Sequence, residues 1–208
     1  MRSSVGVVLL AGPSGSGKSY IARRTGLPVL SLDDFYKDGD DPTLPRRAGL
    51  VDWESPQAWD SAAAVATIAA LVRNGKAEVP VYAIDVDRRV DIRTFDLAGS
   101  PLFIAEGIFA AEIVPECRRL GLLAGAYTLR RPRGATFFRR LVRDLSERRK
   151  TPGLLVRRGI ALARTEPTVL RRQTGLGCLP SRGGQVIRQV AALHATATTT
   201  GAGTGDTA

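Results

Sequence analysis

Residues 12–19 read Gly12-Pro13-Ser14-Gly15-Ser16-Gly17-Lys18-Ser19, which fits the pattern G-x-x-x-x-G-K-[ST] of a phosphate-binding loop. The loop follows Val5-Gly6-Val7-Val8-Leu9-Leu10-Ala11, an apolar run typical of a strand buried on both faces. A helix is expected to begin near Lys18. Glycines allow backbone N–H groups to point inward at phosphate oxygens, and the start of the helix adds partial positive charge. This order of strand, loop and helix predicts a nucleotide-binding site.

The side chains of the loop predict how a triphosphate and a metal ion are held. Lys18 is expected to reach the β- and γ-phosphates, and Ser19 to bind Mg²⁺. The expected contacts to ATP, or to GTP, come from Gly12, Ser14, Gly15, Ser16, Gly17, Lys18, Ser19 and Tyr20. The motif specifies nucleotide binding and leaves the reaction open.

Further strands and helices alternate after the loop. Apolar runs predict strands at residues 28–32, 102–105 and 126–129, and a charged, loosely alternating stretch predicts a hairpin outside the main sheet at 79–92. Helices are expected at residues 57–73, where Ser55 and Pro56 supply the start signals, and at 110–120, 136–149 and 154–170. Together they predict a three-layer α/β fold with a mainly parallel sheet, in which ligands bind at the carboxyl ends of the strands.

The length of 208 residues favours one domain, which we expect to cover residues 1–194. Residues 195–208 are almost wholly Ala, Thr and Gly, which have too little apolar area to offset the entropy of ordering, so a disordered tail is expected. The longest apolar run, 62–72, is far shorter than the roughly 20 residues of a membrane span, and residues 1–12 lack a signal cleavage site. We therefore expect a soluble, cytoplasmic protein without a membrane partner.

Histidine and cysteine are scarce enough to exclude several reaction classes. The one histidine, His194, lies next to the tail, so a histidine base or a serine–histidine pair has almost no residues to draw on. Cys117 and Cys178 are far apart and show no metal-ligand spacing, which predicts two buried thiols rather than a disulfide or a zinc site.

The net charge of +10 is concentrated in one part of the chain. Residues 1–129 contain 14 basic and 16 acidic groups, whereas residues 130–172 contain 14 and 3. Such a segment is expected to face polyanions, either nucleic-acid phosphates or the triphosphate of a nucleotide. Five of its arginines have no predicted role: Arg157, Arg158, Arg164, Arg171 and Arg172.

Two acids follow predicted strands. Asp33 comes after the second strand, which in most folds of this kind lies next to the first, so its carboxylate is expected to reach an acceptor hydroxyl and to accept its proton. Glu106 follows the strand at 102–105 and is expected to hold the metal ion or its waters. Each acid alone would also fit a helix cap or a solvated turn. Their common position at strand ends favours a role in catalysis.

Over roughly residues 5–150 the sequence resembles uridine–cytidine kinases and their phosphoribulokinase relatives. Besides the loop, the motifs that occur in the same order are Ser31-Leu32-Asp33-Asp34-Phe35-Tyr36, Asp52-Trp53-Glu54-Ser55-Pro56, Val79-Pro80-Val81-Tyr82, Ala105-Glu106-Gly107-Ile108 and Arg139-Arg140-Leu141-Val142-Arg143-Asp144-Leu145-Ser146-Glu147-Arg148. The resemblance implies a P-loop NTPase fold of the nucleoside-kinase type, with the hairpin as a small insertion and an arginine-rich helical lid at about 130–152. It also implies ATP- and Mg²⁺-dependent phosphorylation of a small-molecule alcohol, which in uridine kinases is the nucleoside 5′-hydroxyl.

The resemblance also implies roles for individual residues. Asp33 matches the catalytic aspartate, and the metal is expected near Ser19, Asp33 and Glu106. The lid residues expected to close over the phosphates and the acceptor are Arg140, Arg143, Arg148 and Lys150. The residues expected around the acceptor are Tyr36, Glu54, which replaces an aspartate that binds ribose hydroxyls, and Tyr82, at a tyrosine of the base pocket.

Four positions depart from the family pattern. Glu54-Ser55-Pro56 replaces Asp-His-Pro, Ile84 replaces an aromatic residue that packs on the base, and Asp87 stands near the place of a histidine that hydrogen-bonds it. A lost ring and a lost base contact each cost about 1–3 kcal/mol of discrimination. The departures put recognition of a pyrimidine in question while phosphoryl transfer is retained.

Three functions therefore remain open. The first is a nucleoside kinase, and the second is a kinase for another ribosyl compound, a sugar phosphate or a vitamin precursor. The third is a nucleotide-dependent module that binds nucleic acid through the basic segment. Only 6% of the residues are aromatic, so few rings can stack on bases, which argues against the third. The sequence leaves a homo-oligomer open.

Overall fold

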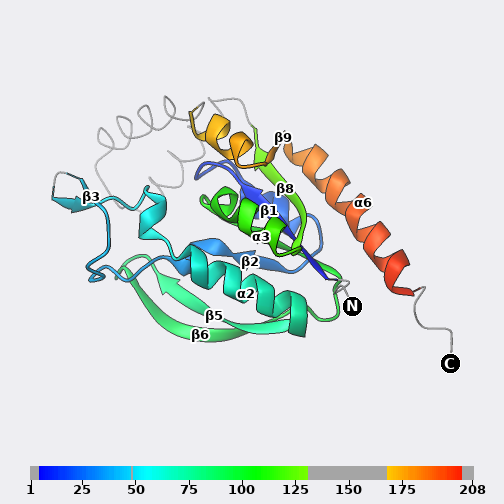
Figure 1. Ribbon diagram of the computed structural model, residues 1–208, viewed down its shortest axis with the longest axis horizontal. Coiled ribbons are helices and arrows are strands. Elements are labelled where there is room, and N and C mark those ends of the chain that lie inside the picture. Colours follow the sequence, from blue (N-terminus) through cyan, green and yellow to red (C-terminus); the bar gives the residue numbers. More distant parts are fainter. Residues whose placement is uncertain (1–4, 48, 131–167, 203–208) are drawn as a thin grey trace.

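A five-stranded parallel sheet forms the centre of the molecule in a computed structural model that describes residues 5–47, 49–130 and 168–202 (Figure 1). Its strands lie in the order β2-β7-β1-β8-β9, and every neighbouring pair is parallel. The strands are β1 (Gly6–Ala11), β2 (Val29–Ser31), β7 (Leu102–Glu106), β8 (Leu123–Leu129) and β9 (Leu179–Ser181). The mainly parallel sheet predicted from the apolar runs is confirmed.

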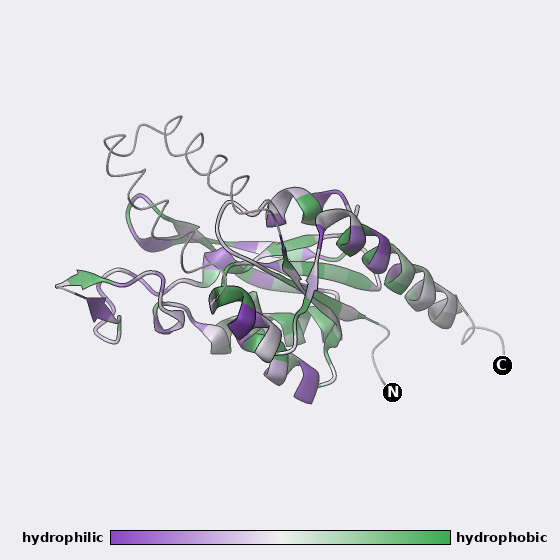
Figure 2. Ribbon diagram, turned by 90° about the horizontal axis from the view of Figure 1, so that it is seen from above, coloured by the Kyte–Doolittle hydropathy of each residue, from purple (hydrophilic) through white to green (hydrophobic). Residues whose placement is uncertain are grey.

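Helices cover both faces of the sheet, which confirms the three layers (Figure 1). Side chains of β1 alternate between the faces, because successive residues of a strand point to opposite sides. Val7 and Leu9 pack in the cluster that contains α2 (Ser61–Asn74) and α3 (Val114–Arg119). Val8 and Leu10 pack in a second cluster, with α1 (Lys18–Arg23) and α6 (Gly183–Ala202). Figure 2 shows hydrophobic residues concentrated in the central strands.

The predicted hairpin forms a separate antiparallel sheet of β5 (Lys76–Ala83) and β6 (Arg88–Asp96), longer at both ends than expected. Its turn is tied to the loop at 38–40, where the Gly39 N–H donates to the Asp87 carbonyl at 2.7 Å and Arg88 pairs with Asp40 at 2.6 Å. A second small sheet pairs β3 (Arg46–Arg47) with β4 (Leu50–Val51). The hairpin is therefore positioned by the segment that follows β2.

The helix predicted at 57–73 begins later than expected, at Ser61. Ser55 caps only the short 3₁₀ turn η2 (Pro56–Ala58), and Asp60 caps α2 by accepting from the Ala63 N–H at 2.9 Å. Between them Trp59 is buried and its indole N–H donates to the Leu32 carbonyl at 2.7 Å. Burial of this one ring holds the chain extended where the local signals favoured a helix.

The helix predicted at 110–120 is divided into the 3₁₀ turn η3 (Ala110–Ile113) and α3. Pro115 lies in the first turn of α3, where its missing N–H is tolerated, whereas it could not continue an α-helix begun at residue 110. The prediction of one continuous helix is therefore wrong.

The disordered tail predicted from residue 195 is wrong for residues 195–202, because α6 continues to Ala202. Alanine has the highest helix propensity of all residues. The hydroxyls of Thr196 and Thr198 donate to the carbonyls of Ala192 and His194, four residues earlier, so they are satisfied within the helix.

Two features of the sheet differ from expectation. Strand β7 lies between β1 and β2, so the second strand is not next to the first. Strand β9, in a segment without a predicted strand, pairs in parallel with β8. Its side chains offer little apolar signal, since Leu179 and Pro180 are exposed and only Ser181 is buried.

The helix predicted at 136–149 and most of that at 154–170 lie outside the described residues, while residues 168–175 are helical. In the described part of the chain no helix has the length and apolar character needed to cross a membrane.

Both cysteines are buried, as predicted, and burial raises the pKa of each thiol to about 12. The thiolate is the reactive form, and it is very scarce at pH 8 when the pKa is near 12. We therefore expect neither Cys117 nor Cys178 to be alkylated by iodoacetamide at pH 8 in the folded protein, and both to react in guanidinium chloride. Mass spectrometry of the two samples tests this, and rapid modification of the folded protein would contradict it.

Candidate active site

The phosphate-binding loop joins β1 to α1 at the carboxyl end of the sheet. Gly12 has a φ of 146°, and a Cβ placed there would lie 3.1 Å from Ser16 Oγ. Gly17 caps α1 with a φ of 85°, in the left-handed region that favours glycine. Both glycines are therefore required by the local backbone. The helix starts at Lys18, as predicted.

The loop fits an oxygen-rich anion. Ser16 Oγ is the one buried side-chain polar atom without a hydrogen-bond partner in the described part of the chain. An unsatisfied buried hydroxyl costs about 1–3 kcal/mol, which a phosphate oxygen would recover. Lys18 is 6% exposed, and its Nζ donates to the Pro13 carbonyl at 3.4 Å, so the ammonium curls back over the loop. These features fit the triphosphate of a nucleotide.

Glu106 ends β7 between the ends of two other strands. It is in register with Leu10 of β1 on one side and Ser31 of β2 on the other. Burial raises the pKa of its carboxyl, while the charge of Lys18 and a hydrogen bond with the Ser19 side chain oppose that shift. A buried carboxylate beside a serine hydroxyl is a hard oxygen donor set of the kind that suits Mg²⁺.

Asp33 lies in η1 (Leu32–Phe35), directly after β2. The Ile108 N–H, from the turn after β7, donates to Asp33 Oδ1 at 3.4 Å. Gly107 packs so closely there that a Cβ would lie 2.8 Å from Leu32 Cβ and 3.1 Å from Asp33 Oδ1. The negative charge of Asp33 contributes to the raised pKa of Glu106. The structure therefore brings both predicted acids to one edge, through β7 rather than through direct pairing of β1 with β2.

The neighbouring acid, Asp34, faces the hairpin instead. It lies 3.9 Å from Arg93 of β6. Burial raises the pKa of Asp34, and a hydrogen bond to the Tyr82 backbone and the charge of Arg93 oppose that shift. Adjacent in sequence, Asp33 and Asp34 therefore have different surroundings.

Aromatic rings form a wall beside Asp33. The ring of Tyr36 lies 5.8 Å from those of Trp53 and Tyr82, and 5.9 Å from that of Phe109. The Tyr36 hydroxyl donates to the Trp53 carbonyl at 3.3 Å. Burial raises the pKa of Tyr36, and that of Tyr82 to about 12, so both phenols are neutral hydrogen-bond donors near pH 7. We refer to Tyr36, Trp53, Tyr82 and Phe109 as the aromatic wall.

Trp53 and Phe109 were not among the predicted site residues. Trp53 stands inside the quoted motif next to Glu54, which was a signal for it, whereas Phe109 has no pattern of its own and reaches the wall only because the turn after β7 turns toward Tyr36.

The remaining predicted residues are mostly exposed side chains. Glu54 is exposed, and its charge contributes to the raised pKa of Tyr36. Ile84 is 64% exposed in the hairpin turn, and Asp87 stands in the same turn with a φ of 51°. The side chain of Tyr20 is exposed, and its hydroxyl accepts from Arg24 at 3.1 Å.

The basic lid lies outside the described residues, including Arg140, Arg143, Arg148 and Lys150. So do three of the arginines without a predicted role, Arg157, Arg158 and Arg164. Of the other two, Arg172 pairs with Glu112 at 2.8 Å.

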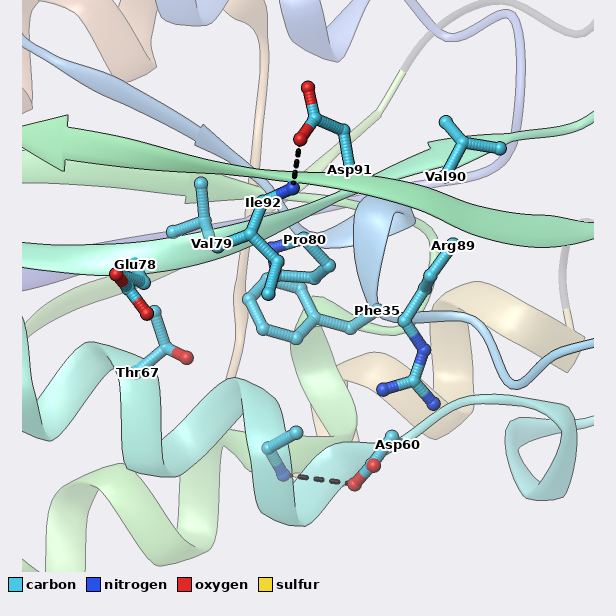
Figure 3. Close-up of a pocket in the computed structure, with 11 residues that line it drawn as sticks. Phe35, Asp60, Thr67, Glu78, Val79, Pro80, Arg89, Val90, Asp91 and Ile92 are labelled. Atoms are coloured by element: carbon cyan, nitrogen blue, oxygen red, sulfur yellow. Dashed lines mark hydrogen bonds between the residues drawn. The ribbon is translucent and has the colours of Figure 1, made fainter.

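A hollow of about 700 Å³ lies between α2 and the hairpin (Figure 3). Its apolar lining includes Phe35, Val79, Pro80 and Ile92, while Arg89 lines it from the hairpin and Asp60 from the start of α2. None of the phosphate-loop residues line it. It is therefore separate from the edge that holds Asp33 and Glu106.

The sequence of the chain was compared with family models and with known proteins. No family model matches it, whereas several curated proteins do. A uridine kinase of Deinococcus deserti is 30% identical over 178 residues, which are 78% of this chain and 82% of that protein. A uridine kinase of Schizosaccharomyces pombe is 35% identical over 109 residues, 49% of this chain but only 24% of that protein.

A solved structure from Silicibacter sp. TM1040, named provisionally as a fructose transport system kinase, superposes with a TM-score of 0.59 at 22% identity. The match covers 79% of this chain and 85% of the other, and it shows the shared fold. Sequence similarity over most of a full-length relative carries the family assignment. On that ground the chain belongs to the uridine kinase family of P-loop kinases.

Proposed function

We propose that the protein transfers a phosphoryl group from ATP to a hydroxyl of a small molecule, and that the acceptor is the 5′-hydroxyl of a nucleoside such as uridine or cytidine. The observation that carries the proposal is the position of Asp33 and Glu106 together at the strand edge next to Lys18 and Ser19. Membership of the uridine kinase family supports it.

In this proposal some residues bind the phosphates and the metal ion, and Asp33 accepts the proton. Lys18 and the backbone of the loop bind the phosphates, and Ser19 and Glu106 hold the metal ion. Mg²⁺, when bound, neutralises charge on the transferring phosphoryl group. Asp33 accepts the proton of the attacking hydroxyl, and the Ile108 N–H orients its carboxylate. Arg140 and Arg143 are proposed to close over the phosphates.

The aromatic wall favours a nucleoside over a sugar phosphate. Rings that surround Tyr36 offer a face for a base. Arg88 and Arg89 of the hairpin, which would serve a phosphorylated acceptor, are paired with Asp40 at 2.6 Å and Asp38 at 3.7 Å. Ile84 is exposed and stands where the family has a ring that stacks on the base. For this reason a kinase for another small alcohol is the second candidate function.

Incubation with ATP, Mg²⁺ and a panel of nucleosides, sugars, sugar phosphates and vitamin precursors tests the proposal. We expect a mass gain of one phosphoryl group on uridine or cytidine. Replacing ATP by GTP in the same assay determines the donor. ATP binding without phosphorylation of any member of the panel would contradict the kinase proposal, and transfer only to another class of alcohol would contradict the nucleoside.

Replacing Trp53 with alanine should raise the KM for the acceptor about tenfold to 100-fold with little change in kcat. The reason is that stacking of a ring on a base is worth about 1–3 kcal/mol. Trp53→Phe keeps a ring and should stay near the wild-type KM. Steady-state kinetics of the two variants test the role of the wall, and an unchanged KM in Trp53→Ala would show that the acceptor does not touch it.

A further inference from the structure

We propose that Gln173 is a positioning residue for Asp33 and that it acts through the backbone of Ile108. The inference rests on the proposed function, since it assigns a residue to the same site. Gln173 lies in the helical residues 168–175, a part of the chain to which the sequence motifs gave no role. It is 4% exposed, although glutamine is mostly found at protein surfaces.

Both ends of the Gln173 amide are hydrogen-bonded. Thr128 Oγ1, in the buried end of β8, donates to Gln173 Oε1 at 2.5 Å. Gln173 Nε2 donates to the Ile108 carbonyl at 3.4 Å. Because the threonine hydroxyl holds the oxygen, the NH₂ group is directed at the turn that follows β7. The amide therefore joins the end of one strand to the turn beyond another.

Ile108 passes this restraint to Asp33. Its N–H donates to Asp33 Oδ1 at 3.4 Å, while its carbonyl accepts from Gln173. The residue before it, Gly107, is fixed on the other side, because its N–H donates to the Leu10 carbonyl of β1 at 3.3 Å. The Leu10 carbonyl and the Gln173 amide therefore restrain the turn on both sides of the peptide group whose N–H donates to the Asp33 carboxylate.

The sheet order explains why such a restraint is needed. Asp33 sits in a 3₁₀ turn beyond the edge strand β2, which is only three residues long. Its carboxylate must be aimed at a hydroxyl beside the phosphate loop, two strands away. Loss of about 1 Å of precision at a reacting group can lower the rate about 10²-fold.

Replacing Gln173 with methionine, which has a similar shape and no amide, tests the role. We expect kcat for phosphoryl transfer to fall about 10- to 100-fold with the KM for ATP near its wild-type value, and the melting temperature to fall because the buried Thr128 hydroxyl loses its partner. A buried pair replaced by apolar groups is often close to neutral, so the double variant Gln173→Met/Thr128→Val should melt near the wild type while it keeps the loss of kcat. If Gln173→Met does not fold, Thr128→Val, which leaves the amide without its holding hydroxyl, should lower kcat in the same direction.

A double-mutant cycle separates positioning from a general structural effect. In an Asp33→Asn background the Gln173→Met change should have little further effect on single-turnover transfer from γ-labelled ATP, because the group it positions is already impaired. In an Asp34→Asn background, matched in charge and place, the full loss should remain. These two results together would identify Asp33 as the group through which Gln173 acts.

The outcomes are distinct. Wild-type kcat in the folded Gln173→Met variant, or losses that multiply fully with Asp33→Asn, would overturn the positioning role and leave the proposed function intact. A wild-type protein that phosphorylates no acceptor would instead overturn the proposed function, and the positioning role with it.

Discussion

Replacing Asp33 with asparagine should lower kcat by about 10²- to 10⁴-fold, the usual contribution of a general base. Asparagine keeps the shape of aspartate and can still hydrogen-bond, but it cannot accept the proton of the attacking hydroxyl. The Ile108 N–H, which donates to Asp33 Oδ1, can donate to the amide oxygen instead, so the turn after β7 should stay in place. We therefore expect ATP binding, measured by calorimetry, to remain close to wild type.

Asp34→Asn is the matched control for this experiment. Asp34 has the same charge and is the next residue, but it faces Arg93 at 3.9 Å and the hairpin. Its replacement should change kcat only slightly, because the charge and the backbone group that act on it, Arg93 and Tyr82, belong to the hairpin. Equal losses of kcat in the two variants would show that the negative charge of this segment matters and that Asp33 is no specific base.

Replacing Lys18 with methionine should lower kcat/KM by about 10²- to 10³-fold, as expected when a preorganised donor to the transferring phosphoryl group is removed. Methionine retains the buried stem, which suits a residue that is 6% exposed, and removes only the ammonium. The charge of Lys18 also lowers the pKa of Glu106 against the effect of burial. Without it the carboxyl is held protonated to higher pH, which weakens its ability to hold a metal ion.

Lys37→Met controls for the loss of a lysine as such. Lys37 donates to Thr43 Oγ1 at 2.9 Å in an exposed loop, so its charge is solvated. Steady-state kinetics over a range of ATP and Mg²⁺ concentrations should show a rise in the Mg²⁺ requirement for Lys18→Met alone. Wild-type kinetics in Lys18→Met would show that the loop does not bind the transferred phosphate.

The local parts of the site could be predicted because their determinants are contiguous. Residues 12–19 contain the glycines, the lysine and the hydroxyl of the loop in one short stretch, and β1 and α1 on either side follow from apolar runs and the glycine turn. Asp33 and Glu106 were found for a similar reason, since each comes directly after a buried strand. The hairpin was recognised from its alternation, although its ends extend further than the pattern predicted.

Other parts depended on residues that meet only after folding. Trp59 breaks the predicted helix because its indole reaches Leu32, 27 positions earlier in the chain. Phe109 joins the aromatic wall, and Gln173 reaches Ile108 across 65 positions, without any local pattern that announces either. Contacts between residues so far apart in the sequence cannot be predicted from local periodicity.

By itself, the sequence determined the phosphate-binding loop, the parallel α/β layers and the two acids at strand ends, because these follow from the order of neighbouring residues. Only the tertiary structure decided that β7 separates β1 from β2, so that Glu106 lies between the loop and Asp33. The physical reason is that these features depend on which surfaces, far apart in the sequence, pack together with the most favourable burial. Strand order, the contacts between aromatic rings and the hydrogen bonds of the buried Gln173 amide are therefore determined by the fold of the whole chain.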